Sequence, residues 1–192
     1  MEDYLLMIVS AMFINNIALI RFMGNCPIVG VSSSMNSAIG MSFAVIFVTT
    51  LAGTTCWIIQ KTVLEVFNLE YLQTLVFILV IASNVQITEM IVQKVSPPLY
   101  RALGIYLPLI TTNCMVFGIS LLNIQDERTF METLVYSISA AVGFAIVLII
   151  LAAIRERMAA TANVPAVLQG VPITLITAGI MALSFAGLMG IE

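Results

Sequence analysis

Asn25–Ser32 reads N-C-P-I-V-G-V-S and Asn113–Ser120 reads N-C-M-V-F-G-I-S, so the pattern N-C-x-x-x-G-[VI]-S occurs twice in this chain of 192 residues. Each copy lies in a mostly apolar run that small and polar residues interrupt. Two copies in one short chain indicate a duplicated structural unit. Each unit places a cysteine, Cys26 or Cys114, at the interruption.

The composition is that of an integral membrane protein. The chain is 61% hydrophobic and 9% charged, and its mean hydropathy is +1.12, whereas soluble domains are roughly half apolar and a quarter charged. Several apolar runs reach the ~20 residues that a helix needs to cross the ~30 Å hydrocarbon layer of a bilayer. Strand-like alternation is absent, so we expect membrane-spanning helices rather than a barrel.

Charge and residue usage exclude several functions. The net charge is −3 and the basic residues do not cluster, which argues against a nucleic-acid partner. Histidine is absent, so any metal site depends on cysteine or carboxylate ligands. Three cysteines are too few for a disulfide framework. The N-terminus lacks the basic start of a secretory signal, and we expect the first apolar run to be retained as a span.

We therefore expect an all-α membrane protein, one integral membrane domain over residues 1–192. Its first and fourth helices are expected to be broken: Gly24 and Asn25 permit a turn before Pro27, and Pro108 precedes the polar run Thr111–Asn113. Six transmembrane helices are predicted, at about 4–22, 37–59, 71–92, 99–122, 130–154 and 171–191.

The duplication extends beyond the cysteine motif. Ala38–Gly40 (A-I-G) has a counterpart in Ala141–Gly143 (A-V-G), and Leu72-Gln73 has one in Leu168-Gln169. This order predicts two three-helix repeats, at about 1–96 and 97–192. Because each unit has an odd number of spans, the second copy enters the membrane from the opposite side, which makes the repeats inverted.

Basic residues near the ends of short loops predict the orientation. With both termini outside the cytoplasm, five of the basic residues fall on the cytoplasmic side, and Lys61 and Arg128 fall outside. The five are Arg21, Lys94, Arg101, Arg155 and Arg157. We assign Arg155 and Arg157 no role beyond this orientation.

The paired cysteines are the candidate functional centre. Inverted symmetry would bring Cys26 and Cys114 towards each other from opposite sides of the membrane. Two thiolates do not complete a four-coordinate iron or zinc site, so a metal would need ligands from another chain or from other groups. The alternative is that both cysteines are ordinary buried side chains. Cys56 has no counterpart in the repeat, and we expect it to pack in the core.

Other polar residues within the spans leave alternatives open. Glu89 lies within the third span, where an acid suggests an ion path, yet it is close enough to the cytoplasmic end to reach water. The remaining polar residues are expected to form hydrogen bonds between helices rather than to bind ions. They are Asn15, Asn16, Asn84, Thr111 and Thr112.

Four stretches carry a resemblance to a known family of membrane subunits, the RnfA/RnfE/NqrD/NqrE family. The match to RnfA ranks above the match to NqrE because of Asn15-Asn16, Cys26-Pro27 and Thr111-Thr112. The stretches are Ile14–Asn16 with Gly24–Pro27, Thr88–Met90, Pro98–Cys114 and Ala152–Arg157.

The resemblance implies a function and partners. RnfA-type subunits belong to the Rnf complex of the bacterial cytoplasmic membrane, which transfers electrons between ferredoxin and NAD+ coupled to Na+ or H+ movement. The family pairs this subunit with an oppositely oriented homologue, RnfE, and the two share an intramembrane 2Fe-2S cluster. By position, Cys26 and Cys114 match the cluster cysteines of the family. Flavins and the NAD site belong to other subunits, of the RnfB, RnfC, RnfD and RnfG types.

The sequence thus predicts an electron-transfer subunit without a complete active site of its own. Two alternatives remain: an NqrE-like subunit of the Na+-pumping NADH:quinone oxidoreductase, and a secondary transporter. Transporters also place inverted repeats and broken helices around a site in the middle of the membrane. The matched thiols favour electron transfer, because a solute site has no special need for them.

Overall fold

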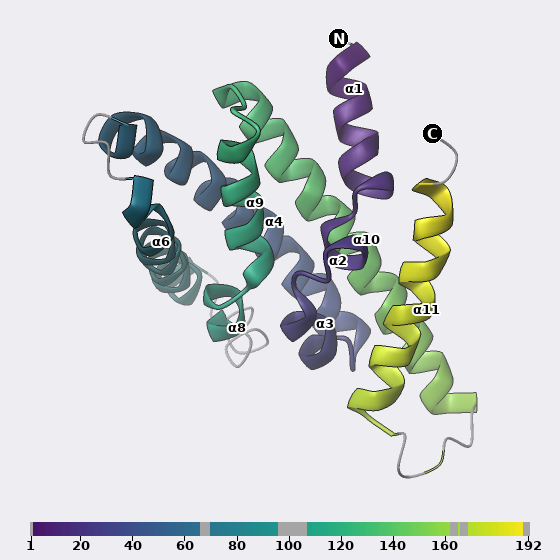
Figure 1. The fold of residues 1–192 in the computed structure, drawn as a ribbon. Coiled ribbons are helices and arrows are strands. Elements are labelled where there is room, and N and C mark those ends of the chain that lie inside the picture. Colours follow the sequence, from purple (N-terminus) through teal and green to yellow (C-terminus); the bar gives the residue numbers. More distant parts are fainter. Residues whose placement is uncertain (1, 66–69, 96–106, 162–164, 166–168, 190–192) are drawn as a thin grey trace.

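The structure is a computed structural model that describes residues 2–65, 70–95, 107–161, 165 and 169–189, and every regular element in this part of the chain is a helix (Figure 1). The predicted all-α class is confirmed for these residues. Residues 99–106 of the predicted fourth span, with Arg101, lie outside the described residues, as does Leu168 of the internal match.

The predicted first span and the residues that follow it form four short helices. They are α1 (Glu2–Val9), the π-helix η1 (Ser10–Ile14), α2 (Ile17–Ile20) and α3 (Asn25–Val31). The predicted break at Gly24 and Asn25 is confirmed: Gly24 has φ = +88°, the left-handed conformation that glycine adopts without cost, and α3 begins at the next residue.

A second break in the same span, at Asn15 and Asn16, was not predicted. The side chain of Asn16 accepts a hydrogen bond from Ala18 N at 3.0 Å and caps α2. Its Nδ2 donates to Met12 O at 2.9 Å and to Gly143 O at 3.0 Å. The buried amide therefore pairs Ala18 N and Met12 O beside the break, as an apolar environment requires, and also ties the break to α10 through Gly143 O.

The fourth span is also broken, as predicted, although not at Pro108. Pro108 lies within α8 (Leu107–Thr111), and the chain leaves the helix at Thr112 and Asn113. Asn113 then caps α9 (Cys114–Gln125), accepting a hydrogen bond from Met115 N at 3.1 Å. The cap residue, rather than the proline, therefore sets the position of the break.

The other predicted spans are long helices. They are α4 (Met35–Ile59), which continues as the π-helix η2 (Gln60–Leu64); α6 (Gln73–Val95), which follows the 3₁₀ turn η3 (Glu70–Leu72); α10 (Phe130–Thr161); and α11 (Val171–Met189). Among the described residues, three helices are long and apolar enough to cross a membrane: Met35–Leu64, Gln73–Ile91 and Phe130–Thr161. Three further apolar helices are shorter, at Tyr4–Ile14, Leu109–Gln125 and Val171–Gly187.

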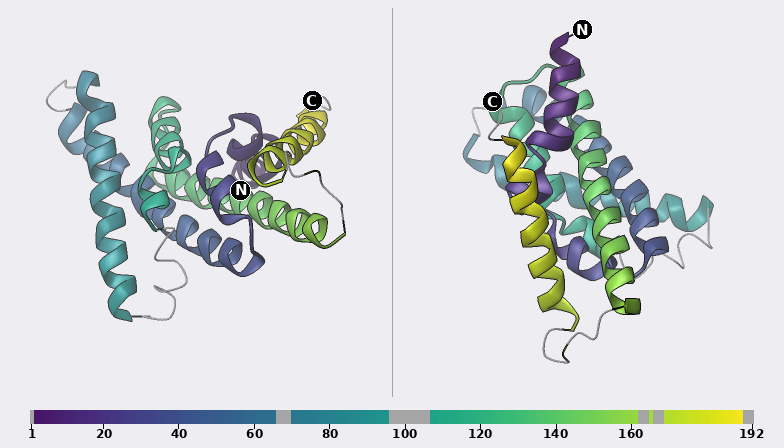
Figure 2. Two further views of the ribbon diagram at one scale, coloured as in Figure 1. Left: turned by 90° about the horizontal axis from the view of Figure 1, so that it is seen from below. Right: turned by 90° about the vertical axis from the view of Figure 1, so that its right-hand side faces the viewer.

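The packing is organised around α10. This helix packs along α4 and also contacts η1, α2, α9 and α11. Fully buried side chains such as Phe144, Met41 and Ile119 fill the space between these helices. In contrast, α6 and α11 lie at opposite edges of the molecule (Figures 1 and 2), and large apolar side chains on both are exposed, for example Leu79 and Leu183.

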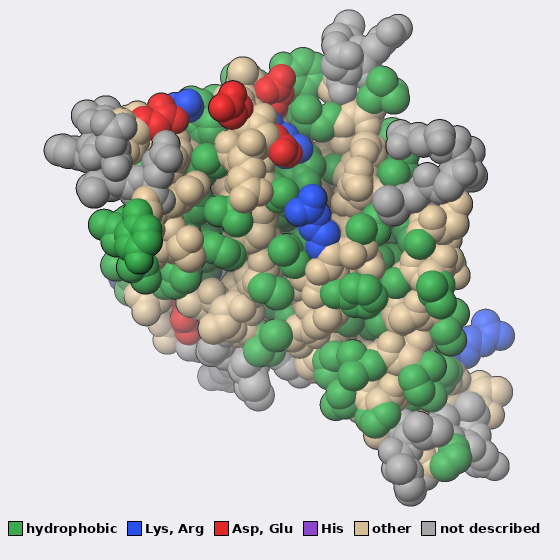
Figure 3. Space-filling view, viewed as in Figure 1, with side chains coloured by type: hydrophobic (Ala, Val, Ile, Leu, Met, Phe, Trp, Pro, Cys, Tyr) green, Lys and Arg blue, Asp and Glu red, His purple; other side chains and the backbone are tan. Residues whose placement is uncertain are grey.

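The surface is consistent with a membrane setting. In the face shown in Figure 3, most acidic side chains gather at one end, and apolar side chains spread over the rest. The beginning of α1 and the end of α11 lie towards the same end of the molecule (Figure 1). Exposed apolar helices of this kind are stable where lipid or another membrane subunit covers them.

Candidate functional site

The turn that precedes the first cysteine motif contacts the second motif. The backbone N–H of Gly24 donates a hydrogen bond to Sγ of Cys114 at 2.9 Å, although the two residues are 90 positions apart in the sequence. Cys26 follows Gly24 by two residues and lies in the first turn of α3, while Cys114 is the first residue of α9. Both cysteines are exposed and neither forms a disulfide. The segments of Cys26 and Cys114 are therefore neighbours, as the repeat predicted.

Gly24 is required at this junction for two independent reasons. Its φ of +88° strains any residue that carries a Cβ. A Cβ at Gly24 would also lie 2.7 Å from Cε2 of Phe144 and 3.4 Å from Cβ of Met115. Phe144 is fully buried on α10, so its ring has no free space into which to move. The close approach between the two motifs depends on the missing side chain.

Asn113 places a second polar group beside Cys114. Its Oδ1 caps α9 through Met115 N, while its Nδ2 is buried and has no hydrogen-bond partner among the described residues. Asn113, Cys114 and Phe117 line the same cavity of about 340 Å³, which α6 closes from the other side through Ile78 and Ile81. A buried N–H without a partner is costly, which suggests that another group completes this site.

These residues could supply part of the ligand set of an iron–sulfur site. They offer two exposed thiols, one N–H already bonded to a thiol sulfur and one unpaired N–H. Among the described residues, no group of three or more Cys, Asp or Glu side chains comes together to hold a metal ion. A four-coordinate iron centre would therefore need ligands from a second chain.

Cys56 differs from the other two cysteines. It is 0% exposed on α4, and its thiol contacts the hydroxyl of Ser120, the last residue of the second motif. Ser120 in turn donates to Val116 O at 3.0 Å within α9. Cys56 thus packs α4 against the helix of Cys114, in agreement with the expected packing role.

Arg155 has a structural role that the sequence did not reveal. From α10, its Nη1 donates to Ser32 Oγ at 2.6 Å and to Val29 O at 3.2 Å. Ser32 also donates to the carbonyl of Ile28. The guanidinium therefore holds the C-terminal end of α3, where a positive charge is favourable. No sequence signal linked Arg155 to α3, because Arg155 and Ser32 are 123 positions apart and meet only through packing.

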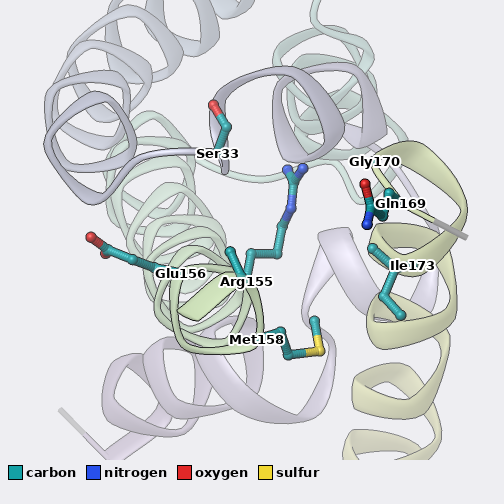
Figure 4. Close-up of a pocket in the computed structure, with 8 residues that line it drawn as sticks. Ser33, Arg155, Glu156, Met158, Gln169, Gly170 and Ile173 are labelled. Atoms are coloured by element: carbon teal, nitrogen blue, oxygen red, sulfur yellow. The ribbon is translucent and has the colours of Figure 1, made fainter. Parts of the chain in front are cut away.

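A cavity of about 450 Å³ adjoins Arg155 and shares no lining residue with the cavity beside Cys114. The guanidinium lies between Ser33 on one side and Gln169 and Gly170 on the other (Figure 4). Glu156 and Ile173 complete much of the lining. Arg155 therefore lines this cavity and also holds α3, the helix that carries Cys26.

The opposite end of the molecule is held by Arg128. Its guanidinium donates to Asn123 Oδ1 at 3.1 Å and to Asp126 Oδ2 at 2.7 Å, and lies 3.5 Å above the ring of Tyr136. Trp57 Nε1 donates to the carbonyl of Arg128 at 2.9 Å. These contacts fix the connection between α9 and α10 and tie it to α4.

Arg21 lies closer to this end than predicted. It lines a cavity of about 180 Å³ together with Asp126 and Arg128, whereas the orientation count placed Arg21 and Arg128 on opposite sides. If Arg21 lies on the same side of the membrane as Arg128, the basic residues divide four against three instead of five against two.

The predicted roles of the remaining polar residues in the spans are confirmed in some cases and not in others. Asn16 forms the predicted bond between helices, through Gly143 O. Asn15 bonds locally to Ser10 Oγ at 3.3 Å, and Nδ2 of Asn84 is buried without a partner among the described residues. Glu89 is half-buried on α6 and forms no ion pair within the described part of the chain.

Comparison with known proteins places the chain in a family. A family model described as "Rnf-Nqr subunit, membrane protein" matches residues 4–192. The chain is 53% identical over 191 residues to a Proteus mirabilis protein named as the A subunit of an ion-translocating oxidoreductase complex, with 100% of this chain and 98% of the relative covered. Proteins of the same name from Shewanella loihica and Vibrio vulnificus are 53% and 49% identical, with 100% of this chain and 99% of each relative covered. The resemblance found in the sequence is confirmed, and the chain belongs to the Rnf-Nqr family of membrane subunits.

Proposed function

We propose that this chain is the A-type subunit of an ion-translocating oxidoreductase complex and that it carries electrons through the membrane. Relatives at 49–53% identity over the whole chain bear the name of that subunit, and the family model covers residues 4–192. The apolar helices provide a membrane-embedded scaffold. Coupling to Na+ or H+ movement then belongs to the complex as a whole.

The observation that carries this proposal is the contact between Gly24 N and Cys114 Sγ at 2.9 Å. Each cysteine lies in the first turn of a helix that follows a break in an apolar segment, and the contact joins the two breaks. A chain that only needed small apolar side chains at these positions would have no reason to expose both thiols at one junction.

We infer that Cys26 and Cys114 supply two of the four thiolate ligands of a 2Fe-2S cluster. The other two would come from a homologous RnfE-like subunit of opposite topology, within a complex that also contains RnfB-, RnfC-, RnfD- and RnfG-type subunits. When bound, the cluster would accept and release one electron at a time. The N–H of Gly24 stabilises negative charge on the Cys114 sulfur, and the N-terminus of α9 adds a favourable electrostatic term.

The helices of this chain would shield the site from water. A hydrocarbon layer of about 30 Å separates the two aqueous sides, so a carrier within it divides the crossing into shorter steps. The cavity beside Cys114 is largely apolar, with Ile78, Ile81 and Phe117 in its lining. These side chains would limit the access of water to the thiolates.

We also propose six spans arranged as two inverted repeats. The first would contain α1 to α3, α4 and α6; the second would contain α8 with α9, α10 and α11. Three long and three shorter apolar helices support six crossings. In both units, a helix break is followed by a helix that starts at an Asn-Cys motif. The beginning of α1 and the end of α11 lie towards the same end of the molecule, which agrees with an even number of crossings (Figure 1).

Iron content tests the shared site. The complete complex, purified from cells, is expected to contain iron attributable to this pair of subunits, whereas the chain expressed alone should purify without stoichiometric iron. An isolated chain replete with iron would show that the ligand set is complete within one subunit. A complete complex with no iron at Cys26 and Cys114 would favour a transporter-like role.

A further inference from the structure

The two ends of the Asn113 side chain have different roles. The Oδ1 atom accepts the hydrogen bond from Met115 N at 3.1 Å and caps α9, which also identifies the other atom of the amide as Nδ2. That Nδ2 is buried and has no partner among the described residues. The residue is only 2% exposed. Capping by itself uses only an oxygen, and aspartate or serine would serve equally well.

The location of Asn113 connects its unpaired N–H with Cys114. The two residues are adjacent in the chain and line the same cavity of about 340 Å³. Most of that cavity is apolar, formed by Ile78, Ile81 and Phe117. A buried amide N–H left unpaired in such surroundings costs free energy, so the site is suited to an acceptor that arrives from outside this chain.

The first motif does not repeat this arrangement. Asn25 precedes Cys26 as Asn113 precedes Cys114, but Gly24 is the cap residue of α3, and Asn25 is the first residue within the helix. Asn25 is half-buried, and its amide is not among the buried groups without a partner. The duplicated asparagines are therefore equivalent in sequence and different in structure.

We propose that Nδ2 of Asn113 donates a hydrogen bond to a sulfur atom of the bound cluster and thereby raises its reduction potential. This inference rests on the proposed function, because the acceptor is the cluster that Cys26 and Cys114 would hold. Hydrogen bonds to the sulfur atoms of iron–sulfur clusters stabilise the more negative, reduced state. Gly24 N–H already acts in this way on Cys114 Sγ, and Asn113 adds a second donor.

The test separates the cap from the donor. Asn113→Ser retains a cap through its hydroxyl oxygen and removes the amide N–H. The serine side chain is shorter, so its remaining O–H lies next to the backbone and not at the position of Nδ2. We expect this variant, in the complete complex, to assemble with normal iron content. The equilibrium constant for reduction should fall about tenfold, which is typical of one hydrogen bond to a charged acceptor and equals about 59 mV for a one-electron couple. The midpoint potential is measured by redox titration of the paramagnetic signal.

Two further variants make the result decisive. Asn113→Asp keeps the shape and the cap but replaces the N–H with an anionic oxygen, so it should lower the potential at least as far, and it serves if the serine variant assembles poorly. Asn25→Ser is the matched control in the first motif and should leave the potential unchanged. An unchanged potential in both Asn113 variants, or an equal shift in Asn25→Ser, would overturn the proposed donor.

The outcome also distinguishes the two proposals. If the wild-type complex holds no cluster at this site, the proposed function fails and the role of Asn113 fails with it. If the wild-type cluster is present and Asn113→Ser leaves its potential unchanged, only the role of Asn113 is refuted.

Discussion

The backbone N of Gly24 lies 2.9 Å from Sγ of Cys114 and joins the turn before the first cysteine motif to the second motif. This single contact links the helix break before α3 to the first residue of α9. It requires a residue without a side chain at position 24 and a thiol at position 114. The first prediction concerns that requirement.

Gly24→Ala is expected to destabilise the junction. The left-handed conformation costs a residue with a Cβ roughly 1–2 kcal/mol, and the 2.7 Å approach to Phe144 Cε2 adds steric strain. Iron content and the thermal midpoint of the complex should both fall. Gly179→Ala on α11 is the matched control, because its Cβ meets nothing within 4 Å. Equal behaviour of the two variants would show that the junction tolerates a side chain.

Arg155→Gln is expected to loosen α3. The guanidinium donates hydrogen bonds to Ser32 Oγ and Val29 O. Loss of hydrogen bonds from a buried charged group lowers the free energy of unfolding by about 1.5–3 kcal/mol. Arg155 is only partly buried, so we expect a loss of about 1–2 kcal/mol. The thermal midpoint should fall and the paramagnetic signal should broaden as the position of Cys26 varies. Arg157→Gln, two residues further along α10 and exposed, should change neither. Wild-type values in Arg155→Gln would refute the role in holding α3.

Asn16→Ala is expected to destabilise the break in the first span. The substitution removes the cap of α2 and leaves Gly143 O without its partner, each at a cost of about 1 kcal/mol or more. The thermal midpoint of the purified complex measures the loss. Asn15→Ala removes only an exposed bond to Ser10 and should have little effect. A larger loss in Asn15→Ala than in Asn16→Ala would contradict the assignment.

Reporters fused after Glu192 test the orientation. We predict both termini outside the cytoplasm, so a reporter active only in the periplasm should be active there, and a cytoplasmic reporter should be silent. Arg21 shares a cavity with Arg128, so the prediction rests on the other four basic residues assigned to the cytoplasmic side. The opposite pattern of reporter activity would reject it.

The long helices were predictable because each is a single apolar run. The predicted span at 37–59 and the described part of the span at 171–191 agree closely with α4 and α11, whereas the span at 130–154 is shorter than α10, which continues to Thr161. The break before Cys26 was predictable from Gly24, a residue type that marks turns. The break at Asn16 was not, because an asparagine in an apolar run looks the same whether it bonds a neighbouring helix or caps a new one.

The candidate site also contains residues that the sequence predicted and residues that it did not. Repetition of the motif identified Cys26 and Cys114, and symmetry predicted that their segments meet. Arg155 and the unpaired N–H of Asn113 could not be found in the sequence, because their roles follow from contacts between α10 and α3 and from burial beside α6. Residue type indicated the candidate ligands, and only packing revealed which groups position them.

The most direct test of the account compares three cysteine variants in the complete complex. Cys26→Ser and Cys114→Ser replace a thiolate with a hydroxyl that binds iron poorly, so each should abolish the iron and the paramagnetic signal assigned to this site while the complex still assembles. Cys56→Ser, at a fully buried position, should cost about 1–3 kcal/mol of stability and retain the signal. A full signal in both Cys26→Ser and Cys114→Ser, or loss of the signal in Cys56→Ser alone, would contradict the claim that the duplicated cysteines are the ligands.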